Sequence, residues 1–558
     1  MAYLGQTLVI LLAISLCWGK YEILNNQASE NVYRSDNPKG PIVTPQPHYL
    51  KNQEKHVKFH ECKVKFKYDN DMLDEIIGVY KDISFGKGYS ERCTEASGGK
   101  DIQVEIKFDS KDKTYLPKGF ESQHEAYSLH VDGKGNTKIE AKHYPGVVRG
   151  LDSFSQLMTR TKENESEYMM EYLPIEIKDE PSYPYRGVML DTSREYFFPE
   201  TIKQILDSML ISRLNVFHWH LMDDDSFPLY LESYPDMTNY TAFSPEEIYT
   251  PKTIKDIVKY AKVRGIKVIP GINGPGHVNI LGNYPKLSSI ISCYRKPVVN
   301  GLAYGSPHGG IINPLEEDSY DFYTNMMKDI HASFECEYCH NGGIVPEFNC
   351  WNSSQEIQDF LHQGGYHQND LTQIFFSKRK EKAQDSAGHQ MTNIYWYQSN
   401  GIKYQEDDIL QYWEMGGKID REFAKYPKNK FILSTSEMNI NCGYLTPFGQ
   451  NSQICFSPMS PDSYVRFPSM SQESKKQVLG VEILAWNQMS NEFDLLTKLN
   501  PHSGASSMIF WNSDYELKGG YMKERLMRLQ YRLKRYGIPT SKVSMRYCEE
   551  HTHHCFGI

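Results

Sequence analysis

The stretch Tyr185–Pro228 constrains the fold more than any other, because it contains two apolar runs with an amphipathic segment between them. Val188–Leu190 is the first run and Asn215–His220 is the second, and apolar residues recur at helical spacing after Pro199. A helix that connects two short buried strands predicts a parallel β-α-β unit. Charged residues follow both strands, which predicts a site at the carboxyl ends of parallel strands.

Strand-like and helical segments continue to alternate after Pro184, which is typical of a parallel sheet. The expected helices cover residues 201–212, 253–264, 318–333 and 356–363. The expected strands begin near Val188, Val216, Ile266, Gly342, Ile394, Leu410, Phe431 and Val481. This pattern predicts an α/β fold in which residues 184–558 form a (β/α)8 TIM barrel, with its site in the loops that follow the strands.

The pattern of residues 20–183 predicts a small α+β domain before the barrel. Segments 64–68, 102–108 and 127–131 alternate apolar and polar residues, as half-exposed strands do, and residues 146–158 have a helical pattern. Lys51–Lys67 is rich in Lys and His, which fits an anionic ligand but more commonly marks a solvated strand face. We assign this domain a supporting role.

The beginning of the chain and its cysteines indicate export. Thr7–Trp18 is a short apolar run followed by small residues, so residues 1–19 are expected to be a signal peptide. No later run is long enough for a membrane anchor, and the net charge of -9 gives no reason to expect a nucleic-acid partner. Ten cysteines remain after Cys17, and the sequons begin at Asn164, Asn239 and Asn352. We therefore expect the secretory pathway, with a secreted or a lysosomal or vacuolar destination.

Three segments, RGVMLDTSR, LNVFHWHLMDDDSFP and YAKVRGIKVIPGINGPGH, closely resemble signature segments of the β-N-acetylhexosaminidases, glycoside hydrolase family 20. Val148–Leu157 resembles the end of that family's N-terminal domain. The resemblance implies a hydrolase that removes terminal β-linked N-acetylglucosamine or N-acetylgalactosamine with retention, helped by the substrate's own acetamido group. It implies terminal N-acetylhexosamine glycans as substrates, no cofactor or metal, and a possible homo- or heterodimer.

The resemblance and the spacing of the cysteines suggest two long disulfides, Cys62–Cys93 and Cys293–Cys350. The other six cysteines would then close locally as Cys336–Cys339, Cys442–Cys455 and Cys548–Cys555. Two motifs offer alternatives: Cys336–His340 matches a short haem-attachment pattern, which often occurs by chance, and the histidines near the C-terminus could bind a metal. A solvated tail closed by a disulfide is the commoner explanation for His551, His553 and His554.

The resemblance implies an adjacent Asp-Glu pair after the fourth strand, where Glu protonates the leaving oxygen and Asp orients the acetamide. Alignment from Gly342-Gly343 or from Cys350-Trp351 places Ile344 and Val345 at these two positions. Glu347 is a possible displaced acid, but two residues of extended chain shift a side chain by about 6.6 Å, beyond hydrogen-bond reach. The alternative for Glu347 is a loop carboxylate that faces water.

At the ends of the other strands, some of the family's site residues are present in this sequence and others are replaced. The resemblance implies that Arg194 binds the sugar's 3- and 4-hydroxyls and that tryptophans line the acetamide pocket. The substrate-binding candidates are Arg194, Asp223, Asp224, His277, Trp396, Trp413, Trp486 and Gln488. Gly271, Asn273, Met438 and Gln488 stand where the family has Glu, Asp, Tyr and Glu, respectively. An Arg and an Asp on adjacent strands can also form a simple ion pair at the barrel rim.

Two hypotheses therefore stand. A general acid contributes about 10²–10⁴ in rate, and electrostatic stabilisation of a developing charge another factor of about 10²–10³, so losing both predicts weak or absent turnover. The first hypothesis is an exported β-N-acetylhexosaminidase with a displaced acid. The second is a catalytically silent sugar-binding protein or partner subunit, and the sequence leaves open whether the chain is an enzyme.

Overall fold

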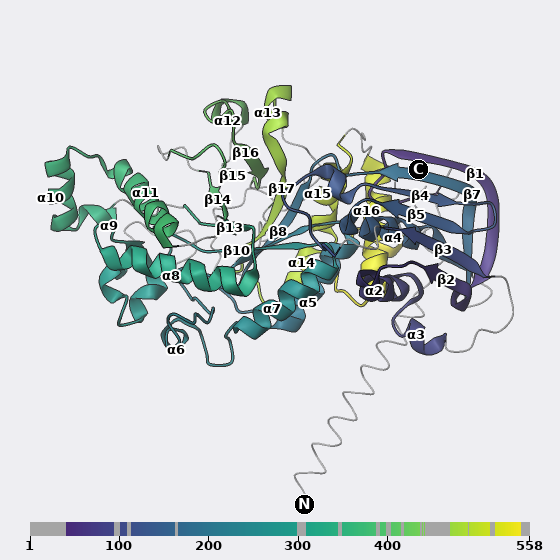
Figure 1. The fold of residues 1–558 in the computed structure, drawn as a ribbon, viewed down its shortest axis with the longest axis horizontal. Helices are drawn as coiled ribbons and strands as arrows, with labels where there is room; N and C mark the ends of the chain where they lie inside the picture. The colour runs from purple at the N-terminus through teal and green to yellow at the C-terminus, as the bar shows by residue number, and fades with distance from the viewer. Residues whose placement is uncertain are drawn as a thin grey trace, which may run out of the picture. The chain divides into compact units, whose positions relative to one another are not determined.

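The chain forms two compact units, and we describe each by itself (Figure 1). The first unit contains residues 1–113, 125–180 and 514–558, and the second contains residues 114–124 and 181–513. The computed structural model describes residues 41–93, 101–108, 113–161, 166–297, 308–343, 349–386, 391–397, 403–413, 418–435, 438, 440, 469–488, 490–513 and 519–547.

The first unit is built on a seven-stranded sheet of order β1-β7-β4-β5-β3-β2, with β6 (Met158–Arg160) paired to β7. The predicted segments form β2 (Val64–Lys67), β3 (Ile102–Lys107), β4 (Tyr127–Val131) and helix α4 (Tyr144–Gln156). The other elements are β1 (Tyr49–His60), β5 (Thr137–Ala141), β7 (Glu167–Asp179) and helix α2 (Asp74–Phe85). The Lys- and His-rich segment occupies the two edge strands, β1 and β2, where its lysines face solvent.

The C-terminal helix α16 (Gly519–Arg535) belongs to the first unit, whereas the sequence assigned it to the barrel. Arg532 forms an ion pair with Asp152 of α4, and Figure 1 shows the two helices side by side. Arg535 donates a hydrogen bond of 2.6 Å to the hydroxyl of Tyr168 in β7. The apolar face of α16 is buried, so these contacts fix the helix in the first unit, although residues 181–513 of the second unit separate it in sequence from the rest of the first.

The second unit is a closed barrel of eight parallel strands, as predicted. The strands are β8 (Tyr185–Asp191), β9 (Val216–His220), β10 (Lys267–Gly271), β13 (Tyr338–His340), β14 (Thr392–Trp396), β15 (Ile409–Tyr412), β16 (Lys430–Leu433) and β17 (Val478–Ala485). The fourth strand ends before Gly342, where its start was predicted. Gly342 and Gly343 have φ angles of 71° and 105°, which suit a turn and not a strand.

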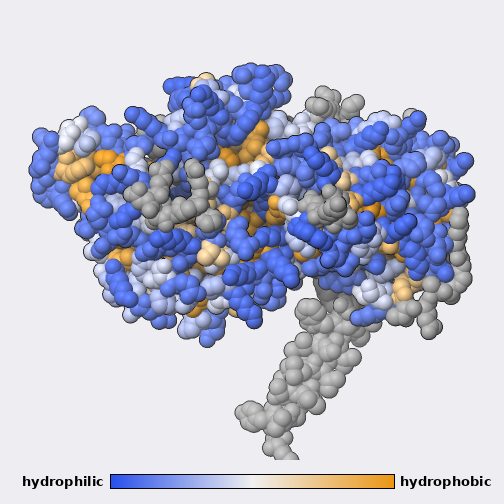
Figure 2. Space-filling view, in the orientation of Figure 1, coloured by the Kyte–Doolittle hydropathy of each residue, from blue (hydrophilic) through white to orange (hydrophobic). Residues whose placement is uncertain are grey.

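The helices around the barrel follow the predicted pattern with one addition. The four expected helices are α5 (Pro199–Ile211), α7 (Pro251–Val263), α8 (Glu317–Phe334) and α10 (Gln355–Gly364). Helix α11 (Gln368–Ser386) was not predicted, because its sequence carries few apolar residues and no clear apolar stripe. No helix in the described residues is long and apolar enough to cross a membrane, and hydrophilic residues cover most of the visible surface (Figure 2).

The short segment Thr114–His124 packs with the barrel, although the residues on either side of it belong to the first unit. The ring of Phe120 lies 5.0 Å from the ring of Tyr185 and 4.8 Å from that of Tyr338. Gly119 N donates to the Glu337 carboxylate at 2.9 Å. Tyr185 and Tyr338 begin β8 and β13, so this segment covers the amino-terminal end of the barrel core.

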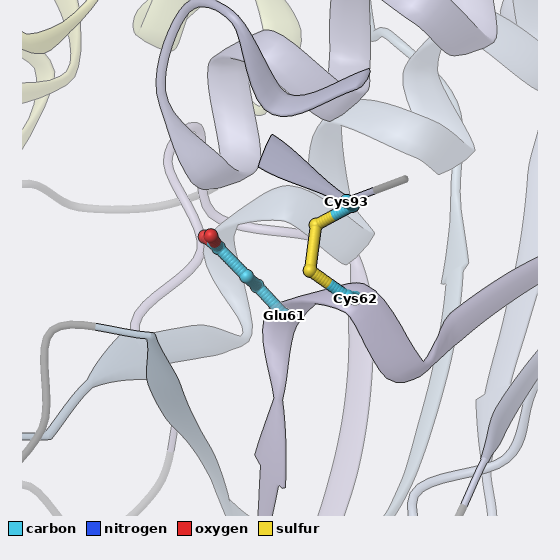
Figure 3. A group of neighbouring side chains, drawn as sticks. All are labelled: Glu61, Cys62 and Cys93. Carbon is cyan, nitrogen blue, oxygen red and sulfur yellow. A yellow bond between two sulfur atoms is a disulfide. The ribbon is translucent and has the colours of Figure 1, made fainter. Parts of the chain in front are cut away.

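The structure confirms the two long disulfides, Cys62–Cys93 and Cys293–Cys350. Glu61 lies beside the first of them, and because both sulfurs are bonded to each other this group offers no thiolate to a metal (Figure 3).

The predicted bridge Cys336–Cys339 is wrong, because both residues are free cysteines. The two thiols have different neighbours: Cys336 Sγ lies 3.6 Å from Met391 Sδ, and Cys339 Sγ lies 3.4 Å from the carbonyl oxygen of Pro270. The remaining cysteines and the C-terminal histidines, Cys442, Cys455, Cys548, Cys555, His551, His553 and His554, lie outside the described residues.

Candidate active site

Arg194 is the centre of a charged cluster at the carboxyl ends of β8 and β9. Its Nη1 lies 2.8 Å from Asp191 Oδ2, its Nη2 lies 2.8 Å from Asp223 Oδ1, and its Nε lies 3.6 Å from Asp225 Oδ2. The side chains of Arg194, Asp191 and Asp223 are almost fully buried, whereas 31% of the Asp225 side chain is exposed. The predicted pair of Arg194 and Asp223 is therefore real, and it is the ion pair that the alternative interpretation described.

His277 joins this cluster from the loop after β10. Its Nδ1 lies 2.8 Å from Asp224 Oδ2 and 3.3 Å from Asp223 Oδ1. Asn273 donates from Nδ2 to Asp223 Oδ2 at 2.9 Å, and the backbone N–H of Asn279 donates to Asp224 Oδ1 at 3.0 Å. The predicted residues Asp223, Asp224 and His277 are thus brought together, and both carboxylates are held by several donors.

The four aspartates of the cluster differ in how their charge is compensated. Burial alone would raise the pKa of Asp223, but the charges of Arg194 and His277 outweigh burial and hold this pKa well below its usual range. Asp225 has only the more distant Nε of Arg194, so burial and the neighbouring carboxylates raise its pKa to about 7. The sequence reasoning missed Asp225, although it stands directly after the two aspartates that were named.

Asp223, Asp224 and His277 also have donor atoms close enough together to hold a metal ion, all within 4.8 Å of one another. Burial lowers the pKa of His277, but Asp223 and Asp224 outweigh it and raise this pKa to about 10. The imidazole is therefore protonated at neutral pH, whereas a metal needs a neutral imidazole nitrogen. The group fits an ion-pair cluster better than a metal site.

Three tryptophans form a wall of the site beside the charged cluster. The ring of Trp396, at the end of β14, lies 6.5 Å from that of Trp413 and 5.7 Å from that of Trp486. The Arg194 guanidinium lies 5.1 Å from the Trp486 ring centre, which connects this wall to the charged cluster. Trp396 is buried, whereas 37% of Trp413 is exposed and available to a ligand. The structure thus brings together the three tryptophans that the resemblance named.

A layer of polar side chains lies inside the barrel next to these tryptophans, and sequence reasoning did not name it. Glu482 is fully buried, and its carboxylate lies 2.9 Å from Nδ1 of His218 and 2.7 Å from Nε2 of Gln411. His218 stacks on His340 with ring centres 4.5 Å apart, and His340 lies 4.7 Å from Trp396. A Glu within the otherwise apolar strand Val478–Ala485 was the signal that could have revealed this network.

Gly271 has a packing role that accounts for its small size. A Cβ atom on Gly271 would lie only 2.2 Å from Nε2 of His218. This position therefore has no room for a side chain while His218 keeps its place against Glu482 and His340. The buried imidazole on the neighbouring strand thus accounts for a glycine at this position.

The remaining predicted site residues are placed only in part. Met438 is buried near the end of β16, where its backbone N–H donates to the carbonyl of Thr435 at 2.8 Å. Gln488 is half-buried in the turn after Trp486. Ile344, Val345 and Glu347 lie outside the described residues, so the replacement of the catalytic pair remains a prediction.

Comparison with known families fits this geometry. Residues 183–514, more than half of the chain, match the catalytic domain of glycosyl hydrolase family 20. The chain belongs to glycoside hydrolase family 20. Residues 43–157 of this family 20 chain match a second domain, described as beta-acetyl hexosaminidase like.

Curated relatives cover most of this family 20 chain. It is 28% identical over 527 residues to the beta-hexosaminidase subunit alpha of Mus musculus, an alignment that spans 91% of this chain and 94% of the mouse protein. It is 26% identical over 511 residues to the chitooligosaccharidolytic beta-N-acetylglucosaminidase of Bombyx mori, with 88% and 83% of the two chains covered.

Solved structures share the fold. The chitobiase of Flavobacterium johnsoniae superposes with a TM-score of 0.72 at 21% identity, over 88% of this chain and 72% of that one. The exo beta-N-acetylglucosaminidase of Vibrio harveyi, in complex with N-acetylglucosamine, superposes with a TM-score of 0.71 at 19% identity, over 92% and 80% of the two chains. These two likenesses establish the TIM barrel and its preceding α+β domain as the architecture of the family 20 chain.

Proposed function

We propose that this family 20 chain binds a terminal sugar in its barrel mouth and hydrolyses it weakly or not at all. The family removes terminal N-acetylhexosamine residues. The observation that carries the proposal is the cluster at Arg194: Asp191 and Asp223 are held by its guanidinium, and Asp224 by His277. Asp223, whose pKa is held well below its usual range, has no proton to donate to a leaving group, and the other two carboxylates are occupied by their ion-pair partners.

Asp225 is the described carboxyl group that best resembles an acid, because its pKa is raised to about 7. Asp225 lies on the Nε side of Arg194, however. The family resemblance assigns Arg194 to the sugar's 3- and 4-hydroxyls. These hydroxyls lie across the pyranose ring from the anomeric carbon, where the proton is needed. Asp225 is therefore better placed to accept a hydrogen bond from a hydroxyl than to protonate the leaving oxygen.

Retention of a sugar is supported by the other wall of the site. The exposed part of Trp413 offers a flat apolar surface of the kind on which a pyranose stacks. Arg194 offers remaining N–H donors and Asp225 offers acceptors for hydroxyl groups. The resemblance aligns Met438 most simply with the family's Tyr, so we expect the N-acetyl end to lack that hydrogen-bond donor. We infer weak binding with poor selectivity for the N-acetyl group.

A paired assay on the purified full-length glycoprotein tests the proposal. Calorimetry with N-acetylglucosamine measures binding, and a chromogenic β-N-acetylglucosaminide measures turnover. The expected result is measurable binding with turnover reduced by about 10²–10⁴ relative to an active family member. Robust turnover that disappears in Glu347→Gln would favour the first hypothesis, an active hexosaminidase with a displaced acid. Robust turnover lost in Asp225→Asn would identify that residue as the acid.

We also propose that the chain enters the secretory pathway and acts as a subunit of a dimer. The apolar run Thr7–Trp18 and the two disulfides support export, since disulfides persist in oxidising compartments. The names of the mouse and pig relatives describe them as subunits alpha and beta, which supports a dimer. Expression in cultured cells, with immunostaining and sedimentation of the purified product, tests both proposals.

A further inference from the structure

Two phenylalanines stand exposed beside the barrel mouth, in loops that follow β8 and β17. Phe198 is 45% exposed and Phe493 is 93% exposed, the largest value among the large hydrophobic side chains in the described ranges. We call this area, with the carboxylates named below, the Phe198–Phe493 surface. Apolar side chains that are held out into water near one another commonly mark an interaction surface.

Hydrogen bonds hold both phenylalanines in place. The backbone N–H of Phe493 donates to Asn491 Oδ1 at 2.9 Å, and that of Asn491 donates to Asp494 Oδ1 at 2.9 Å. The backbone N–H of Phe198 donates to Glu492 Oε1 at 2.7 Å, which links the two loops. These bonds order the backbone of the turn, so binding at Phe493 would need little further ordering of the loop.

Five acidic side chains gather near the loop of Phe198, where their charges act on Glu195 and Tyr196. The five acidic side chains are Glu195, Glu200, Glu247, Glu492 and Asp494. Within the described part of the chain, only Asp494 of these five has an ion-pair partner, Lys498 at 2.6 Å. Burial, together with the charges of Glu247 and Glu492, raises the pKa of Tyr196 to about 12. The Phe198–Phe493 surface therefore combines two exposed apolar rings with several carboxylates.

We propose that the Phe198–Phe493 surface docks a basic protein segment that carries at least one large apolar side chain. Lysine or arginine side chains would neutralise the unpaired carboxylates, and the apolar side chain would cover Phe493. A second copy of the chain fits less well, because a twofold contact would bring the same carboxylates together. A neutral glycan would stack on the rings but leave the charges uncompensated.

The surface also adjoins the sugar site along the chain. Glu195 directly follows Arg194, and the loop of Phe493 begins after Trp486. A docked segment would therefore lie at the edge of the barrel mouth, where it could limit or direct access of a glycan. This inference does not depend on whether the pocket hydrolyses sugar.

The test uses the full chain and a short fluorescein-labelled peptide of lysine and glycine around one phenylalanine, with binding measured by fluorescence anisotropy. We expect saturable binding that weakens as salt rises, and about tenfold weaker binding to Phe493→Ser. Glu247→Gln should weaken binding by a smaller factor. Tyr366→Ser is the matched control, because Tyr366 is 45% exposed in the turn after α10, which contributes none of the five carboxylates, and it should bind as the wild type does.

Several results would overturn the proposal. Equal binding of a peptide with glutamate in place of lysine would exclude recognition of charge, and equal binding to Phe493→Ser would exclude the surface. Binding of a β-linked N-acetylglucosamine oligomer that is lost in Phe493→Ser would identify a glycan platform instead. A dimer that dissociates on the same substitution, measured by sedimentation, would identify a second copy as the occupant.

Discussion

Nδ1 of His277 lies 2.8 Å from Asp224 Oδ2 and 3.3 Å from Asp223 Oδ1, so one imidazole is shared by two buried carboxylates from the neighbouring strand's loop. Burial lowers the pKa of His277, but the two charges outweigh it and raise this pKa to about 10. The proton that His277 retains therefore contributes to the stability of the charged side of the site, and this contribution depends on pH in a definite direction.

His277→Gln should cost more stability at low pH than at high pH. Because the folded-state pKa of His277 is raised from about 6.5, its contribution is complete below about pH 6.5 and is lost as pH rises through about 10. Urea unfolding near pH 6 should show a loss on the order of a few kcal/mol, and unfolding near pH 10.5 a much smaller loss. His362→Gln, at an exposed position of α10, is the control. A loss that is the same at both pH values would contradict the protonated imidazole.

Asp225→Asn should stabilise the protein at pH 8 more than at pH 4. Burial raises the pKa of Asp225 to about 7, so the folded state favours the protonated acid. This preference contributes fully below about pH 4 and is lost as pH rises through about 7. Asn keeps the size of the side chain and cannot ionise, and its advantage therefore grows across this range.

Melting temperatures of the wild type and Asp225→Asn near pH 4 and pH 8 check this expectation. Asp256→Asn, exposed on α7, should show no such trend. If the substitution lowered the melting temperature near pH 8, the Asp225 carboxylate would have to be stabilised by Arg194 more than it is penalised by burial.

Arg194→Met should destabilise the fold and abolish sugar binding. Asp191 and Asp223 are almost fully buried, and Arg194 is bound to both at 2.8 Å. Removing one partner from a buried ion pair leaves an uncompensated charge and costs about 3–5 kcal/mol. Arg194→Lys should recover part of this loss but not the binding, because an ammonium group lacks the planar fork of donors. Denaturant unfolding and calorimetry give the two quantities separately, and a Met variant as stable as the wild type would refute the argument.

Gly271→Ala should cost about 1–3 kcal/mol, because overpacking forces a buried neighbour to move. The new Cβ would lie 2.2 Å from Nε2 of His218, and this ring is held by its hydrogen bond of 2.9 Å to Glu482. In a His218→Ala background the same substitution should cost little. Gly78→Ala in α2 has open space around its Cβ and should be neutral or slightly stabilising. Denaturant unfolding of Gly271→Ala, His218→Ala, the double variant and Gly78→Ala measures these costs. If Gly271→Ala lowered the free energy of unfolding as much without His218 as with it, the packing argument would be wrong.

The sequence predicted the barrel well because strand and helix periodicity carries most of the information about a parallel fold. It placed the fourth strand too late, because Gly342 and Gly343 look like part of a buried run when their positive φ angles are not known. Cys336 and Cys339 are close in sequence, but their thiols face different neighbours, Met391 and the carbonyl of Pro270. Local spacing cannot show such a separation.

The sequence identified those site residues that stand at or shortly after the end of a strand, such as Arg194, Asp223 and the three tryptophans. Asp225 and the buried network of Glu482 were missed, because their environment depends on contacts between residues far apart in sequence. His218 and Glu482, for example, are 264 residues apart. The place of α16 in the first unit depends in the same way on contacts such as that of Arg535 with Tyr168.

The segment Thr114–His124 covers one end of the barrel, and its place in the chain also affects the order in which the barrel can assemble. Because Phe120 rests on the first residues of β8 and β13, the part of the chain that closes the barrel's amino-terminal end is made on the ribosome before any barrel strand. The eight strands therefore emerge when this piece of their core is already present, tethered at both ends by the first unit's sequence. Residues 183–514 expressed alone would lack it, and would leave Tyr185 and Tyr338 without the aromatic ring that covers them. The catalytic domain of this chain is thus not separable by a single cut.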